Sequence, residues 1–191
     1  MQLTYFQDKM AYLVYLTIGN ISKDICRKLS CHAHIPLGYI PTTKLVGIGN
    51  KATRRCALAN LFYGCMRTVL DPIAHIGETG VPMMSGDGIW WQCHPILAVF
   101  VGDYPEQALV TCTYNGRCPK CEVPPGCLGE YKTFPSHFQS TAINTYLLAD
   151  SNVTVFHCAC WDAGLKPVHH PFWEMLPLTN IFLSIMPDIL H

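Results

Sequence analysis

The chain has 191 residues, of which 50% are apolar and only 14% are charged, and this balance excludes a largely disordered protein. Its 13 basic and 13 acidic residues cancel, which argues against a free-standing nucleic-acid-binding module with a basic face. No stretch reaches the roughly 18 to 20 apolar residues that a membrane span needs, so we expect no membrane contact.

The first predicted elements are strands followed by one long helix. Residues 3–6 and 11–21 are rich in strand-forming side chains and flank a short polar turn, which predicts an antiparallel hairpin. Residues 35–40 predict a third short strand, at a sheet edge because of Pro36. A helix is predicted over about 53–76, since apolar residues recur there at four-residue intervals: Ala57, Leu61, Cys65, Val69 and Ile73.

The second half predicts one buried strand and then irregular and helical segments. The strand covers residues 95–101 and stops at Gly102. Residues 112–129 are too rich in Cys and Pro for a regular element, and residues 142–163 predict a helix. The order of strands, helix and strand indicates an α/β domain with a mixed sheet.

Asp103 is the leading catalytic candidate, because it follows the predicted buried strand directly. Open α/β sheets place reactive groups at the carboxyl ends of their strands. A metal-dependent phosphoryl transferase needs two or three such carboxylates to hold its divalent ions. The competing interpretation is a plain turn, since Pro105 follows. Other acidic residues fall near predicted loops: Asp87, Glu106, Glu174 and Asp188.

A cysteine-rich segment follows, and it predicts a structural zinc site. Cys118 and Cys121 form a CxxC pair that could offer two thiolates to one ion, with Cys112 and Cys127 six residues away on either side. A redox-active pair or bare thiols are the alternatives. Further ligand candidates besides Cys127 complete the set: His157, Cys158, His169 and His170.

The cysteine count also bears on the compartment. Eleven cysteines is an odd number, and the opening residues MQLTYFQDK lack the apolar core of a secretory signal. We therefore expect free or metal-bound thiols in a reducing compartment, nuclear or cytoplasmic. The aromatic tail around residues 169–174 is interpreted as packing, with a platform for stacking nucleobases as the alternative.

Longer segments of the sequence resemble the Plavaka-type transposases of mushroom-forming fungi, which are related to the KDZ and CACTA groups. The matching segments run in order over almost the whole chain: QLTYF, AYLVYLTIGNISKDI, GYIPTTKL, ALANLFYGCM, SGDG, GDYPEQALVTCTYNGRCPKC, HPFWEMLP and NIFLSIMPDILH. This resemblance implies an RNase H-like fold and cleavage of DNA at transposon ends with Mg²⁺ or Mn²⁺, with a homo-oligomer as a further expectation. From this resemblance together with the cysteine spacing, we expect a partial RNase H-like core over residues 1–110, a Cys-rich zinc knuckle over 111–130, and a helical, aromatic and Pro-rich continuation of the core over 131–191 that is truncated at its C-terminus.

The resemblance also implies which acidic residues the catalytic set would use. Its second member falls on Asp103, the first would lie ahead of Gln2, and the third beyond His191, with Asp188 as a candidate substitute. We therefore expect a fragment without catalytic activity, in which Asp103 is a remnant. The second hypothesis is a non-enzymatic, zinc-stabilised module that binds DNA or a protein.

Overall fold

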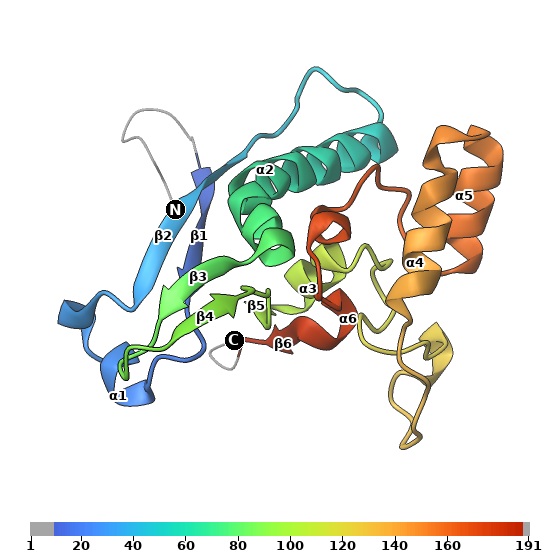
Figure 1. Ribbon diagram of the computed structural model, residues 1–191. Coiled ribbons are helices and arrows are strands. Elements are labelled where there is room, and N and C mark those ends of the chain that lie inside the picture. The colour runs from blue at the N-terminus through green and yellow to red at the C-terminus, as the bar shows by residue number, and fades with distance from the viewer. Residues whose placement is uncertain (1–9, 189–191) are drawn as a thin grey trace. The chain divides into compact units, whose positions relative to one another are not determined.

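The computed structural model describes residues 10–188 and has a mixed α/β architecture, as predicted (Figure 1). The chain divides into two compact units, Met1–Val69 and Leu70–His191. Helix α2 (Lys51–Thr79) runs from the first unit into the second. Within the described residues the strands form three separate two-stranded sheets.

The first unit contains an antiparallel strand pair. β1 (Met10–Thr17) pairs with β2 (His34–Thr42), and the register shifts between Val14 and Tyr15. Between the strands lie α1 (Lys23–Cys26) and the 3₁₀ turn η1 (Leu29–Cys31). Both predicted strands are confirmed, although the first ends earlier than expected because a turn begins at Gly19. The predicted strand at 3–6 lies outside the described residues.

Helix α2 confirms the predicted helix, although its most buried face is not the predicted stripe, whose members are only half-buried: Ala57, Leu61, Cys65, Val69 and Ile73. The side-chain amide oxygen of Asn50 accepts hydrogen bonds from the backbone amides of Ala52 (2.8 Å) and Thr53 (3.3 Å), which caps the amino end. Tyr63, Met66 and Leu70 are buried at the three- and four-residue spacing of one helical face. The helix ends before Gly80, whose φ of +74° is a conformation that favours glycine.

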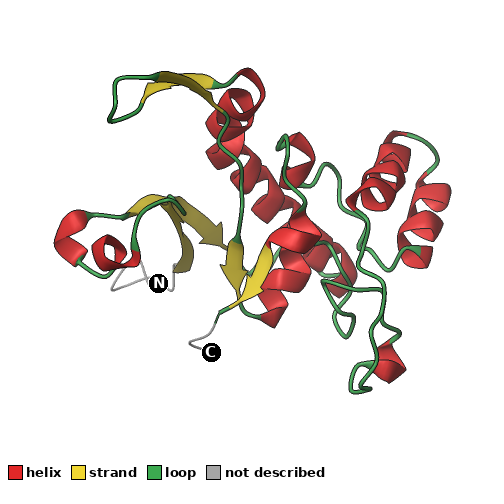
Figure 2. Cartoon of the chain, turned by 60° about the horizontal axis from the view of Figure 1, so that its bottom comes forward, coloured by secondary structure: helices red, strands yellow, loops and turns green. Residues whose placement is uncertain are grey.

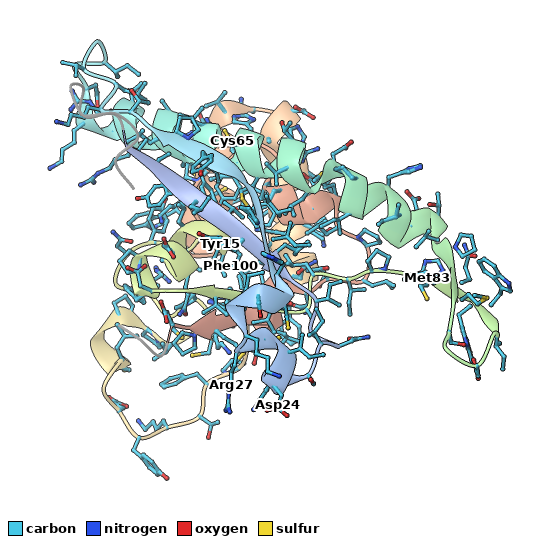
Figure 3. The ribbon with its side chains drawn as sticks, turned by 90° about the vertical axis from the view of Figure 1, so that its left-hand side faces the viewer. Tyr15, Asp24, Arg27, Cys65, Met83 and Phe100 are labelled. Atoms are coloured by element: carbon cyan, nitrogen blue, oxygen red, sulfur yellow. The ribbon has the colours of Figure 1, made fainter. Side chains whose placement is uncertain are left out.

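The second unit opens with a hairpin that the sequence did not predict. β3 (Val81–Met84) pairs with β4 (Trp90–Cys93) in antiparallel register, and Figure 3 shows Met83 on this ribbon. Met83 and Trp91 face each other across it, and both side chains are more than half exposed. The predicted strand at 95–101 shrinks to β5 (Phe100–Gly102), and it is followed by α3 (Tyr104–Val110).

The rest of the unit is helical and ends in a strand. The predicted helix over 142–163 is two helices, α4 (Gln139–Tyr146) and α5 (Val153–Asp162), separated by the 3₁₀ turn η3 (Leu147–Asp150). The split follows from Asn152, whose side chain accepts from the amide of Thr154 at 2.8 Å and so starts a new helix. The remaining elements are η2 (Pro125–Cys127), η4 (Phe172–Met175), α6 (Ile181–Ser184) and β6 (Ile185–Pro187).

The aromatic tail forms the core of the second unit. Phe172 and Trp173 are completely buried, and the Trp173 ring lies 6.0 Å from Tyr146 and 6.1 Å from Phe182, centroid to centroid. The indole N–H of Trp173 donates to the carbonyl oxygen of Val110 at 2.8 Å. These rings hold the tail against the core, so Phe172 and Trp173 are not displayed for stacking on nucleobases.

Candidate functional site

The candidate site is built on a parallel pair of strands that lie far apart in the sequence. The short strands β5 and β6 lie side by side near the carboxyl end of the described chain (Figure 2). In their parallel register Gly102 is opposite Pro187. The backbone amide of Asp188 then donates a hydrogen bond of 3.1 Å to the carbonyl oxygen of Gly102. Asp103 and Asp188 therefore follow directly after neighbouring strand ends at the same edge of the sheet.

Asp103 also has a structural task at this edge. Its carboxylate accepts a hydrogen bond of 2.9 Å from the amide of Glu106 and so caps α3. Pro105 lies in the first turn of this helix, where a missing N–H costs nothing. This cap arrangement replaces the plain turn that the competing interpretation expected, since α3 begins at Tyr104. It leaves Asp103 half-buried, with further lone pairs on its oxygens that can accept a cation.

The Glu106 carboxylate packs against Gly102. A side chain there would place its Cβ 2.8 Å from Glu106 Oε2 and 3.0 Å from Glu106 Cβ, so the Glu106 carboxylate lies over this glycine. The Gly102 carbonyl oxygen accepts a second hydrogen bond, 2.8 Å from Nε2 of the buried Gln107. The edge thus carries three acidic residues, Asp103, Glu106 and Asp188, and we call them the carboxylate edge.

The carboxylate edge falls short of a ready-made centre for two metal ions. Nowhere in residues 10–188 are three or more His, Cys, Asp and Glu side chains grouped so that they could hold a metal ion. Two carboxylates with water can hold one divalent cation. The other loop carboxylates lie elsewhere: Asp87 accepts from Ser85 in the β3–β4 turn, and this bond lowers its pKa, while Glu174 contacts His170 at 3.3 Å.

The CxxC pair occupies a turn rather than a helix start. The backbone amide of Lys120 donates to Cys118 Sγ at 3.4 Å. Burial raises the pKa of the Cys121 thiol, a hydrogen bond with Cys118 raises it further, and a hydrogen bond from the backbone of Val123 opposes both effects. The two sulfur atoms are therefore neighbours, and each accepts an amide hydrogen bond from two residues further on.

His137 lies beside this turn, and the sequence reasoning did not select it. Its backbone amide donates to the Lys120 carbonyl at 3.1 Å, and its ring Nε2 donates to the Cys118 carbonyl at 3.1 Å. An isolated antiparallel β-bridge between the backbones of Cys121 and Ser136 extends the same pairing. The only signal in the sequence was a histidine between the CxxC pair and the next predicted helix, which says nothing about this chain reversal.

The remaining predicted ligands are placed differently. Cys112 is completely buried and lies near Cys160, whose own thiol pKa is raised to about 11 by burial and then by Cys112. Cys127 is half-buried in η2. Cys158 is exposed on α5 beside His157, the His169 ring lies tilted with its centroid 5.6 Å from that of Phe156, and His170 contacts Glu174. Cys112 is thus not grouped with Cys118 and Cys121 into a three-ligand set among the described residues.

A mixed α/β chain with acidic residues after neighbouring parallel strands is typical of metal-dependent phosphoryl-transfer cores. A family model described as Plavaka transposase matches residues 1–191, the whole chain. The chain therefore belongs to the Plavaka transposase family and is a transposase-derived protein, as the resemblance in its sequence indicated. No curated protein and no solved structure gives a match. In the part of the chain that the structure describes, no helix has the length and apolarity to cross a membrane.

Proposed function

We propose that this chain is a transposase-derived core that binds a single divalent cation, Mg²⁺ or Mn²⁺, through Asp103 and Asp188, and that it does not cleave DNA. The observation that carries the proposal is the hydrogen bond from the Asp188 amide to the Gly102 carbonyl, which brings the two residues to one sheet edge. We assign an RNase H-like fold to the chain. In this fold β5 and β6 are neighbouring parallel strands of the catalytic sheet, and the helical segment between them is an insertion.

The expected lack of cleavage follows from the number of ions. Strand cleavage by this chemistry uses one ion to activate the attacking oxygen and a second ion to stabilise the leaving oxygen. Within residues 10–188, Asp103, Glu106 and Asp188 do not form a group that could hold a metal together. One ion on two carboxylates can bind a DNA phosphate, but it cannot perform both roles.

Cation binding is tested by titrating the whole chain with Mn²⁺ and measuring bound ion by electron paramagnetic resonance. We expect one weak site that is lost in Asp103→Asn and in Asp188→Asn. Asp24→Asn is the matched control, because Asp24 is exposed in α1. Binding that survives both substitutions at the carboxylate edge contradicts the proposed site.

Cleavage is tested by incubating the chain with supercoiled DNA and Mg²⁺ or Mn²⁺. We expect no nicking above the level seen without protein. Nicking that disappears in Asp103→Asn would show that the chain is an active nuclease and would overturn the proposed inactivity.

The second candidate function is a non-enzymatic module, stabilised by zinc in residues 111–130, that binds DNA or a protein. It is favoured by the CxxC turn, in which both sulfurs accept amide hydrogen bonds and lie next to each other. Because the family implies DNA binding in the intact protein, DNA is the first partner to test, in a nuclear or cytoplasmic setting. Fluorescence anisotropy with labelled duplex DNA, before and after chelation of zinc, distinguishes the two candidates, and sedimentation tests for a homo-oligomer.

A further inference from the structure

In the turn that contains the two cysteines, backbone amides are placed to stabilise cysteine thiolates. Amide hydrogen bonds reach both sulfurs, from Lys120 to Cys118 at 3.4 Å and from Val123 to Cys121. Such bonds stabilise the negative charge of a thiolate, which is the form that binds metal. A plain surface turn has no need for two sulfurs that lie side by side with this pattern.

Two neighbouring thiolates repel each other, so the turn favours a bound cation. Burial raises the pKa of the Cys121 thiol, and the neighbouring Cys118 raises it further. A Zn²⁺ ion displaces the thiol protons and replaces the repulsion with two coordinate bonds. The free energy of binding zinc would then stabilise the folded loop, because the unfolded chain has no preformed site.

His137 is the candidate for a third metal ligand. It lies on the segment that pairs antiparallel with the CxxC turn. Two hydrogen bonds fix it there, one from its backbone amide to Lys120 and one from ring Nε2 to the carbonyl of Cys118. A ring that donates through Nε2 carries its free lone pair on Nδ1. This is the tautomer of a zinc-bound histidine, whose second nitrogen commonly donates to a backbone carbonyl.

We propose that Cys118, Cys121 and His137, through its Nδ1 atom, bind one Zn²⁺ ion, with a water molecule completing the tetrahedron. The proposal gives the second candidate function its ligands, and it rests on zinc being bound at this segment. All three residues are half-buried, so an ion can reach them from solvent. Binding draws the His137 ring toward the sulfurs, since the described residues hold no ready-made group of three.

Cys112 is left out of this set for a physical reason. Its side chain is completely buried near Cys160, and its carbonyl oxygen accepts a hydrogen bond of 2.6 Å from the amide of Lys166. Moving this thiol to the CxxC turn would open a cavity in the core and break that contact. His137 already lies beside the CxxC turn, where its backbone amide donates to the Lys120 carbonyl.

The experiment measures zinc on the whole chain and on four variants, by metal analysis and by competition with a chromogenic chelator. We expect one zinc per wild-type chain and none in Cys118→Ser or Cys121→Ser. In His137→Phe we expect the affinity for zinc to fall by roughly tenfold or more relative to the wild type. This variant removes both ring nitrogens but keeps a ring that can pack against Phe182, whose centroid lies 5.1 Å from that of His137. Cys158→Ser, an exposed cysteine on α5, should bind zinc like the wild type.

A spectroscopic measurement separates ligation by His137 from a structural role. Co²⁺ in place of zinc should give a tetrahedral visible spectrum, with sulfur charge-transfer bands for two thiolates and a ligand-field band that shifts in His137→Phe. An unchanged cobalt spectrum and affinity in His137→Phe would overturn the assignment of His137 while leaving the zinc-stabilised module standing. A wild-type chain that binds no zinc would overturn both.

Discussion

The backbone amide of Asp188 donates a 3.1 Å hydrogen bond to the carbonyl oxygen of Gly102. This hydrogen bond ends the parallel pairing of β5 with β6, which begins at Phe100 and Ile185. Parallel strands require a long crossover, and here the whole segment from α3 to α6 provides it. Asp103 and Asp188 therefore lie at the same sheet edge only because the intervening segment folds.

Two substitutions of Asp103 should distinguish its role in capping α3 from its role in binding a cation. Asp103→Ala removes the acceptor for the Glu106 amide and should lower the free energy of unfolding by about 1 kcal/mol. Asp103→Asn keeps an acceptor oxygen and should be nearly as stable as the wild type, while it loses Mn²⁺ binding. Urea unfolding monitored by circular dichroism measures the first effect. Equal destabilisation by both variants would contradict the capping role.

Gly102 should not tolerate even a methyl group. In Gly102→Ala the new Cβ would lie 2.8 Å from Glu106 Oε2 and 3.0 Å from Glu106 Cβ, so the Glu106 side chain must shift. We expect a loss of about 1 to 3 kcal/mol in the free energy of unfolding, as for an overpacked core site. Gly86→Ala is the control, because a Cβ there meets nothing within 4 Å. A Gly102→Ala chain as stable as Gly86→Ala would show that Glu106 moves aside freely.

The sequence predicted the elements whose signal is local. Helix α2 follows from apolar residues repeated every four positions, and β1 and β2 follow from runs of strand-forming residues. The break between α4 and α5 was missed because the apolar pattern continues through η3, although Asn152 carried a capping signal. The β3–β4 hairpin was missed because its four-residue strands are too short to show a period.

The candidate sites show the same division between local and long-range information. Asp103 could be selected from its place after a strand, and the CxxC pair from its spacing. The position of Asp188 beside Asp103 could not be derived, since β6 has three residues and its partner lies in a remote segment. His137 reaches the cysteines only through the pairing of Lys120 with His137, which no pattern in the sequence marks.

Trp173 should be the most sensitive aromatic residue of the second unit. Trp173→Phe removes the donor to the Val110 carbonyl, leaves that buried oxygen without its 2.8 Å partner, and opens space among Tyr146 and Phe182. We expect a loss of about 2 to 4 kcal/mol in the free energy of unfolding. Trp161→Phe, at a side chain that is 63% exposed, should cost well under 1 kcal/mol by comparison. Similar losses at both positions would contradict a core built on the tail.

Cys160 should give the chain a dependence of stability on alkaline pH. Burial raises the pKa of its thiol from 9.0 to about 11 in the folded chain, with a smaller contribution from Cys112. The unfolded chain therefore releases this proton at lower pH than the folded chain. The stabilising contribution is complete below about pH 9 and is lost as the pH rises toward about 11.

The measurement compares wild type and Cys160→Ala in urea at about pH 8 and about pH 10. The alanine variant should be less stable at the lower pH, because it leaves a small cavity, but its stability should fall less steeply as the pH rises. Cys158→Ala controls for the other groups that titrate in this range, since Cys158 is exposed on the same helix. If wild type and Cys160→Ala lose stability in parallel, the thiol of Cys160 ionises at the same pH in both states, and its burial does not control the alkaline transition.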